Sequence, residues 1–312
     1  MFKIINEREK PKTDTIVKVI GVGDAGGNTI NHLIQEGVPG VEFIAINTDA
    51  ESIKRSMAHR KLLLGKMETG ANARPEVGRD AALGKREEIA KALMGAHMVF
   101  IVVGMGGGTG TGAAPVIARI AREMGMPTIA VATKPFAWED ERTEIAEIGI
   151  VELQKHVDSL IVVSCDRLDV VFGGDATMKE VFDAVDNMLG DIVAIIANHG
   201  LVTVDLNDVR AVMGKTGRAT MGSATAYGQN RARAAAERAV VSPLLEDAGL
   251  SSAKGVLVNI TASHNLKMNE VNEVMSAICE FTADDAHIIF SVVCDENMGE
   301  QLRVTVVTTG LA

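Results

Sequence analysis

The sequence predicts an α/β protein with a doubly wound parallel sheet in its first half, a long central helix and a smaller α/β domain in its second half. The chain has 312 residues, which is enough for two well-filled cores. Short apolar runs alternate with helical patterns in the first half, and this alternation produces a parallel sheet covered by helices. A mostly apolar helical pattern then runs over 177–198, as expected of a helix buried between two domains. We place the domains at 1–175, 176–199 and 200–312.

The composition excludes several classes of protein. Acidic residues outnumber basic ones by 41 to 31, which argues against nucleic acid as a main partner because phosphate backbones need Lys and Arg surfaces. Cys165, Cys279 and Cys294 form no CxxC pair, so neither a zinc site nor a disulfide framework is indicated, and a reducing cytosol fits. Residues 1–12 lack a signal-peptide core, and no apolar run approaches the roughly 18 residues that a membrane helix needs. We therefore expect no direct insertion into a membrane.

The first strand leads into a glycine-rich turn. Strand 15–20 is followed by the turn 21–28, which contains a G-x-G-x-x-G pattern, and a helix is predicted from about Thr29. The next strand, 41–46, ends at Asn47-Thr48-Asp49. An acidic residue about 20 positions after the glycines is typical of a dinucleotide-binding Rossmann unit. A dinucleotide site and a mononucleotide site would both place the ligand at the carboxyl edge of a Rossmann-like sheet.

The remaining elements of the first half follow the same alternation. Strands are predicted at 62–64, 98–103, 128–133 and 159–164. Helices are predicted at 52–60, at 75–93, from Pro115 onwards, and from the loop 134–139 through 153. Pro75 lies in the first turn of its helix, where proline is well tolerated.

A second glycine-rich stretch, 104–115, lies between the buried strand 98–103 and a helical pattern. Five of the seven residues from 106 to 112 are glycine, and the other two are Thr109 and Thr111. In a strand–loop–helix arrangement, the backbone N–H groups and the positive end of the helix dipole favour a phosphate. A simple turn needs only one or two glycines, and the Lys-Ser/Thr ending of a P-loop is missing. A single nucleotide bound between the two glycine clusters would contact both of them, whereas a Rossmann dinucleotide site does not need the second cluster.

The second half carries no glycine-rich phosphate loop. Thr177 is expected to cap the central helix, and the segment 200–209 after it carries Asp205 and Asp208. Strands are predicted at 218–222, 255–260, 286–293 and 302–307, and helices at 229–240 and 268–281. On spacing alone, the two acidic residues are typical of a solvated turn.

The loop 104–115 resembles the signature of the tubulin and FtsZ family of GTPases, especially its bacterial cell-division members. Matching motifs extend over most of the chain, at 47–49, 75–79, 134–136, 155–160, 242–247 and 303–307. The resemblance implies the tubulin/FtsZ fold and a GTPase that hydrolyses GTP to GDP and phosphate, with Mg²⁺ bound alongside. It also implies a cytoplasmic protein at the division site that assembles head to tail with itself and meets other division proteins. Residues 1–175 would bind GTP, 176–199 would form the connecting helix, and 200–312 would activate the GTPase.

Individual site residues are carried over from the resemblance. The nucleotide-binding residues it implies are Gly23, Asp24, Ala25, Gly26, Asn28, Asn47, Ala73, Gly104, Gly106, Gly107, Gly108, Thr109, Gly110, Thr111, Gly112, Pro135, Glu139, Arg142, Cys165, Phe182 and Asp186. Phe182 would stack on guanine and Asp186 would accept hydrogen bonds from the base, while Glu139 and Arg142 would contact ribose and phosphate. Asp205 and Asp208 of one subunit would complete the site of the next, since a carboxylate near the γ-phosphate can orient a water.

The sequence also departs from the family pattern. Asp24 stands where the family usually has glycine, and Arg74 stands where it usually has asparagine, so we hypothesise that Arg74 compensates Asp24 across the pocket. Thr203 and Cys165 replace asparagines, which predicts slower hydrolysis with guanine specificity kept. The family usually continues past the last strand with a linker and a tail that binds membrane-tethering partners. The sequence leaves open whether this chain is shortened or is a tail-less member.

Two other functions remain open at this point. A regulatory member of the family would bind GTP and co-assemble with little hydrolysis, which the substitutions at Asp24, Thr203 and Cys165 favour. A Rossmann-type NAD-dependent oxidoreductase is supported only by the first glycine cluster and Asp49.

Overall fold

The computed structural model describes residues 16–38, 40–65, 70–71, 73–173, 175–196, 201–202, 204, 206–214, 218–245 and 250–311. Its strands are β1 (Val17–Val22), β2 (Val41–Asn47), β3 (Arg60–Leu63), β4 (Met98–Gly104), β5 (Thr128–Lys134), β6 (Ser159–Ser164), β7 (Arg218–Tyr227), β8 (Gly255–Ala262), β9 (His287–Cys294) and β10 (Gln301–Leu311). Its α-helices are α1 (Gly23–Gln35), α2 (Ala50–Arg55), α3 (Pro75–Gly84), α4 (Arg86–Leu93), α5 (Gly108–Glu123), α6 (Asp140–Gln154), α7 (Cys165–Phe172), α8 (Met178–Ile196), α9 (Leu206–Met213), α10 (Arg231–Val240) and α11 (Met268–Phe281). None of these helices combines the length and the apolar character needed to cross a bilayer.

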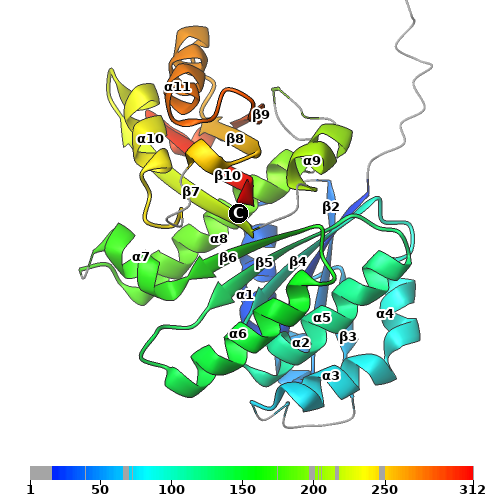
Figure 1. Ribbon diagram of the computed structural model, residues 1–312. Helices are drawn as coiled ribbons and strands as arrows, with labels where there is room; N and C mark the ends of the chain where they lie inside the picture. Colours follow the sequence, from blue (N-terminus) through cyan, green and yellow to red (C-terminus); the bar gives the residue numbers. More distant parts are fainter. Residues whose placement is uncertain are drawn as a thin grey trace, which may run out of the picture.

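The strands form one sheet in the order β3-β2-β1-β4-β5-β6-β7-β10-β8-β9 (Figure 1). The first six strands are all parallel, which confirms the doubly wound sheet predicted for the first half. In the second half, β10 runs antiparallel to both β7 and β8, and β9 is parallel to β8. The two parts meet through a single pair of residues, Ile161 of β6 and Ala219 of β7.

Strand β1 illustrates how the sheet separates two apolar cores. Val17 and Val19 belong to one buried cluster, which contains residues of α1 and α8, whereas Ile20 and Val22 belong to another, which contains residues of α4, α5 and α6. Both faces of the sheet are therefore covered, so the strands can be apolar on both sides.

Helix α8 connects the two halves of the molecule. Leu189 and Ile192 lie in a cluster that also includes Val19 of β1 and Val307 of β10, so this helix is buried against both halves. Its start is fixed by Thr177, whose Oγ1 accepts from the N–H of Glu180 at 3.3 Å, while the Glu180 carboxylate accepts from the N–H of Thr177 at 2.8 Å. This reciprocal pair is a capping box, and it confirms Thr177 as the predicted cap.

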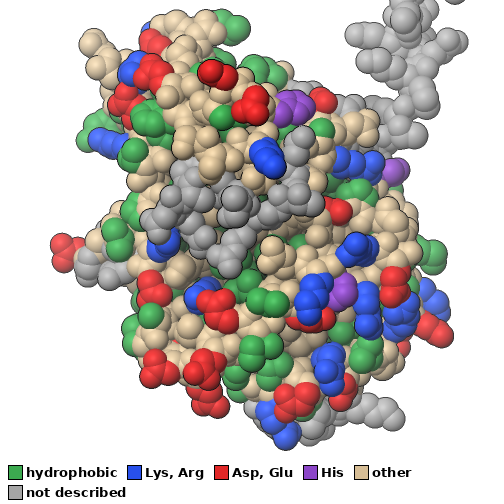
Figure 2. All heavy atoms as spheres, in the orientation of Figure 1, with side chains coloured by type: hydrophobic (Ala, Val, Ile, Leu, Met, Phe, Trp, Pro, Cys, Tyr) green, Lys and Arg blue, Asp and Glu red, His purple; other side chains and the backbone are tan. Residues whose placement is uncertain are grey.

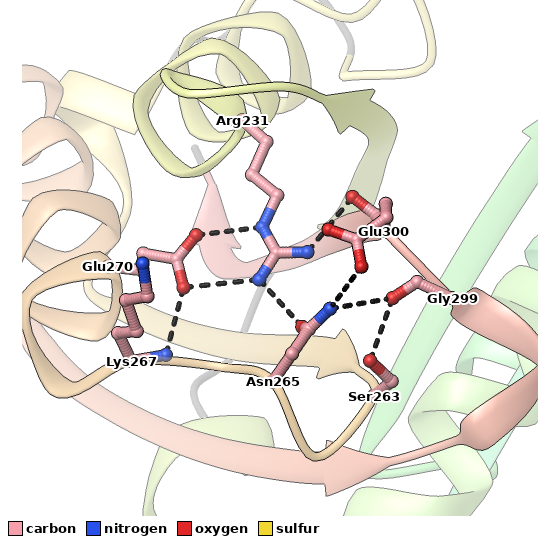
Figure 3. A network of polar contacts seen from close by, with 7 residues as sticks. All are labelled: Arg231, Ser263, Asn265, Lys267, Glu270, Gly299 and Glu300. Carbon is pink, nitrogen blue, oxygen red and sulfur yellow. Dashed lines mark hydrogen bonds and ion pairs between the residues drawn. The ribbon is translucent and has the colours of Figure 1, made fainter.

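A buried polar network holds together one end of the second half (Figure 3). The Arg231 side chain on α10 is buried and donates to Glu270 of α11 at 2.7 and 3.1 Å, to the side chain of Asn265 at 2.8 Å and to the backbone carbonyl of Glu300 at 2.9 Å. Asn265 in turn donates to the carbonyl of Gly299 at 3.0 Å. The network ties the loop after β8 and the turn before β10 to two helices.

The structure differs from the predicted elements in several places, and α9 (Leu206–Met213) has no predicted counterpart. The helix expected over 75–93 is two helices, because the backbone at Lys85 leaves the helical region with φ −112° and ψ 18°. Helix α1 begins at Gly23 rather than near Thr29, since Gly23 adopts φ +74° and turns the chain directly out of β1. Helix α7 was not predicted, and it follows β6 without an intervening loop.

Candidate functional site

A cavity of about 690 Å³ opens at the carboxyl edge of the parallel strands. Val22, Asn47, Gly104 and Lys134, which end β1, β2, β4 and β5, all line it. Most of the predicted binding residues line it as well, namely Gly23, Asp24, Ala25, Asn47, Ala73, Gly104, Gly106, Gly107, Gly108, Thr109, Gly110, Pro135, Glu139, Arg142, Cys165 and Phe182. The edge where parallel strands end is the usual ligand site of such sheets.

The second glycine loop brings the start of α5 to this cavity. The N–H of Gly106 donates to Thr111 Oγ1 at 2.9 Å, which closes the loop, and the hydroxyls of Thr48 and Thr109 are 2.5 Å apart. A Cβ added to Gly110 would lie 2.2 Å from the carbonyl oxygen of Gly104, so only glycine allows the helix to begin this close to β4. The N-termini of α1 and α5 both contribute lining residues, an arrangement that favours an anion.

The predicted residues that do not line the cavity are Gly26, Asn28, Thr111, Gly112 and Asp186. Gly26 and Gly112 are packing positions, because an added Cβ would lie 2.3 Å from the Val102 carbonyl oxygen and 1.9 Å from that of Pro75, respectively. Asn28 lines a neighbouring cavity between α1 and α2, and Thr111 is buried beneath the loop. These residues therefore shape the loops rather than face the space between them.

Helix α8 and the start of α7 form one end of the cavity. Phe182 lines the cavity with 43% of its surface exposed. Asp186, one turn further along α8, accepts from Thr29 Oγ1 at 2.7 Å, and burial raises the pKa of its carboxyl group. Burial also raises the pKa of the Cys165 thiol to about 11, so Cys165 presents a neutral side chain to the cavity.

An exposed aromatic pair lies beside the cavity. Phe136 lines it, and Trp138, with 76% of its surface exposed, stacks on Phe136 at a centroid distance of 5.4 Å. Other lining residues that the sequence prediction did not assign to the site are Val22, Thr48, Asp49, Gly70, Ala71, Met105, Thr133 and Lys134. Thr48 and Met105 directly follow a strand, whereas Val22, Thr133 and Lys134 lie at the end of one, and this position was the signal that could have identified them.

Charges around the cavity are unevenly distributed. The two lining cations, Lys134 and Arg142, form ion pairs with Glu147 and Glu139. Acidic side chains gather over α6 at the lower left of Figure 2, whereas Lys and Arg gather over α4 and α5 at the lower right. The acidic side chains of α6 therefore follow directly on the lining residue Glu139, which precedes that helix.

Asp24 lines the cavity from the first turn of α1. Its Oδ1 accepts from Asn47 Nδ2 at 2.8 Å and from Ser52 Oγ at 2.6 Å. In the described part of the chain no ion pair joins Asp24 to Arg74, whose side chain is exposed and does not line the cavity. The expected compensation by Arg74 is therefore absent as a direct contact.

Asp208, one of the two acidic residues predicted to act in catalysis, is not part of this cavity. Asp208 is exposed in the first turn of α9 and does not line the site of its own chain. Asp205, together with Thr203 and Asn72, lies outside the described residues. The segment before α9 is attached to β9, since Leu201 donates its N–H to the carbonyl of Val292 at 2.8 Å.

Comparisons with known proteins match both halves of the chain. Residues 16–172 match the GTPase domain of the Tubulin/FtsZ family, and residues 217–312 match the C-terminal domain of the FtsZ family. The cell division protein FtsZ of Pseudomonas putida and that of Pseudomonas aeruginosa are each 48% identical to this chain, over 100% of it and 79% and 80% of their own lengths. A structure of an empty FtsZ dimer from M. jannaschii superimposes with a TM-score of 0.90 at 37% identity, over 96% of this chain and 89% of that one.

These matches exclude the dinucleotide alternative, because the residues that suggested it fall inside the matched GTPase domain. They also confirm the predicted fold class and the resemblance found in the sequence. The chain belongs to the tubulin/FtsZ family of GTPases, and within that family to FtsZ.

Proposed function

We propose that this chain hydrolyses GTP at a site completed by the next subunit of a head-to-tail filament. At the level of the family, the chain is a GTPase that forms filaments in bacterial cell division. The proposal concerns how the site is assembled. One observation carries it: the cavity that would bind the nucleotide is lined by residues of the first half and by Phe182 of α8, and not by Asp208.

The contacts of the cavity support distinct roles for its two ends. The N–H groups at the starts of α1 and α5 would bind the phosphates, and the Thr109 hydroxyl would donate to them. Phe182 would stack on guanine, and Asp186 would accept from the base after a small movement, since it lies one turn from Phe182 on the same helix. Glu139 and Arg142 would contact ribose and phosphate.

The site also fits Mg²⁺ as a companion of the nucleotide. Carboxylates of Asp24 and Asp49 and hydroxyls of Thr48 and Thr109 are oxygen donors, which Mg²⁺ prefers. The described residues contain no group of three or more His, Cys, Asp or Glu that could hold a metal by itself, so phosphate oxygens would supply the remaining ligands. Bound there, Mg²⁺ would offset the negative charge of the phosphates.

Asp208, and with it Asp205, would act on the neighbouring subunit. An exposed carboxylate on a short helix can approach the γ-phosphate of another chain, where it would hold and orient the attacking water. The first half would thus bind GTP, α8 would connect the halves, and the second half would activate its neighbour. We further propose a cytoplasmic location at the division site and contacts with other division proteins.

The test is GTP hydrolysis measured against protein concentration, with light scattering followed in the same sample. A shared site predicts specific activity that rises above a threshold concentration together with scattering. The Asp208→Ala variant should keep GTP binding and lose roughly 10²–10⁴-fold in turnover. Asp285→Ala is a matched control, because Asp285 is also exposed but lies just before the start of β9. The segment before α9 is attached near the other end of that strand, at Val292.

Two outcomes would contradict the shared site. Hydrolysis strictly proportional to concentration without scattering would mean that one chain is sufficient. Scattering with GTP but very little hydrolysis would instead favour a regulatory member that co-assembles, the alternative that Cys165 in the cavity lining and Thr203 support.

A further inference from the structure

Asp24 places a fixed carboxylate inside the proposed phosphate site. It lies in the first turn of α1 and lines the cavity together with Gly23, whose added Cβ would lie 3.3 Å from the N atom of Gly110 in α5. Asp24 thus lies at the start of α1, where α1 approaches the start of α5, and it also borders the neighbouring cavity between α1 and α2. Hydrogen bonds from Asn47 at 2.8 Å and Ser52 at 2.6 Å hold it in this position.

The side chains that donate to Asp24 are neutral, so in the described part of the chain no cation offsets its negative charge, and only the N-terminus of α1 does so. The side chains of Asn47 and Ser52 carry no charge, and Ser52 Oγ also contacts the carboxylate of Asp49 at 2.7 Å. The two cations of the cavity lining are already paired with glutamates, and no ion pair to Asp24 occurs in the described part of the chain. A nucleotide phosphate entering this end therefore meets a second anion.

We propose that Asp24 makes guanine-nucleotide binding by this chain strongly dependent on a divalent cation. This inference rests on the proposed function and concerns the same site. Glycine, the residue that the family resemblance leads one to expect at position 24, would leave the helix N-termini free for the phosphates. With Asp24 present, a cation between the carboxylate and the phosphates relieves the repulsion that the phosphates otherwise meet, because oxygen ligands from both can surround it.

The size of the effect follows from Coulomb repulsion. At a protein surface, the repulsion between two unit charges about 4 Å apart corresponds to a change of about tenfold or more in affinity, so loss of the cation should weaken binding by at least about tenfold. A chain without the carboxylate at position 24 keeps most of its affinity when the cation is removed.

The experiment titrates the purified chain with a fluorescent GDP analogue, once with Mg²⁺ and once with EDTA. GDP is chosen because its binding is read without turnover. Asp24→Asn removes the charge but keeps an acceptor oxygen for Asn47 and Ser52, and Glu51→Gln removes a charge from exposed Glu51 on α2, which does not line the cavity. The unchanged chain and Glu51→Gln should lose about tenfold or more in affinity with EDTA, and Asp24→Asn less than about threefold.

The outcomes separate this inference from the function on which it rests. Equal losses in the unchanged chain and in Asp24→Asn would overturn the role of Asp24 while leaving nucleotide binding intact. Failure of the unchanged chain to bind GDP with or without Mg²⁺ would instead overturn the proposed function. Asp24→Gly is the second variant if Asp24→Asn does not fold, and it should show the same small dependence on Mg²⁺.

Discussion

The two halves of the molecule fix their loops at the sheet edge in opposite ways. In the first half, backbones approach each other directly, as at Gly110 and Gly112, where an added Cβ would lie 2.2 and 1.9 Å from carbonyl oxygens. In the second half, a long side chain, Arg231, fills the space between loops and is buried in four hydrogen bonds. The difference shows what a ligand site requires: backbone N–H groups stay free to face the cavity only where side chains do not fill it.

The largest effect on stability is expected for Arg231→Ala. Removing one partner of a buried pair leaves the Glu270 carboxylate unpaired, which costs about 3–5 kcal/mol. Denaturant unfolding measures this loss. Arg233→Ala on the same helix is the control, because Arg233 pairs with Glu237 and Glu280 at the surface and its loss should cost less than about 1 kcal/mol. Similar losses for both variants would contradict the comparison.

The same network predicts a pH dependence. Hydrogen bonds from Arg231 lower the pKa of Glu270 in the folded protein. A carboxyl group with a lowered pKa stabilises the fold above its ordinary pKa, and this contribution is lost as the pH falls through the lowered value. Unfolding of Arg231→Ala should therefore depend less on pH in the acidic range than that of the unchanged chain.

Gly112→Ala should have the next largest effect, now in the first half. The added methyl group meets the carbonyl of Pro75, so α3 and α5 must separate, at a cost of about 1–3 kcal/mol. GDP binding should weaken as well, since α5 carries the loop that lines the cavity. Gly84→Ala on α3 is the control, because no heavy atom lies within 4 Å of its added Cβ. Equal stability of the two variants would show that close backbone contact is not what holds this half together.

Asp186→Asn tests the base end of the site. If Asp186 accepts from guanine, this change should reduce the preference for GDP over other nucleoside diphosphates by roughly tenfold, the value of one charge-assisted hydrogen bond. Because burial raises the pKa of Asp186, the unchanged chain should lose guanine affinity on acidification at a higher pH than an ordinary aspartate would cause. A pH dependence retained in Asp186→Asn would exclude this role.

The smallest expected effect is that of Thr177→Ala at the start of α8. Loss of the hydrogen bond that the Thr177 hydroxyl accepts from the N–H of Glu180 should cost about 1 kcal/mol in the unfolding free energy. Thr177→Ser keeps the hydroxyl and should be nearly neutral, so a large loss in Thr177→Ser would show that the capping box is not the source of the effect.

The positions of the strands were predicted well from the sequence where local patterns agree with the final packing. The apolar runs of β1, β4 and β5 are buried on both faces and leave little ambiguity. The prediction was wrong at the start of α1, because Gly23, Gly26 and Gly27 have a low helix propensity. A helix is stabilised there only by tertiary packing against β1 and β4, which the local sequence does not show. The prediction missed α7 because an eight-residue helix has too few turns to show a period.

The residues of the site were predicted only where the sequence matches the motifs of the family. The lining by the two glycine loops agrees with the residues quoted from the sequence, and their individual roles stay predictions. The partners of Asp24 could not be inferred, because Asn47 and Ser52 reach it only once β2 and α2 are folded beside α1. Phe136 and Trp138 were likewise not recognised as a stacked pair, since two aromatic residues at this spacing in a loop carry no pattern of their own.

The stacked Trp138 gives the protein a built-in optical probe. The chain contains 1 tryptophan, so its indole emission originates from a single place, the rim beside Phe136. Because that indole is largely in water, its emission maximum should shift towards the blue when anything covers it, without a dye being attached. Any binding event that covers this rim can thus be followed in the unlabelled protein through its own fluorescence.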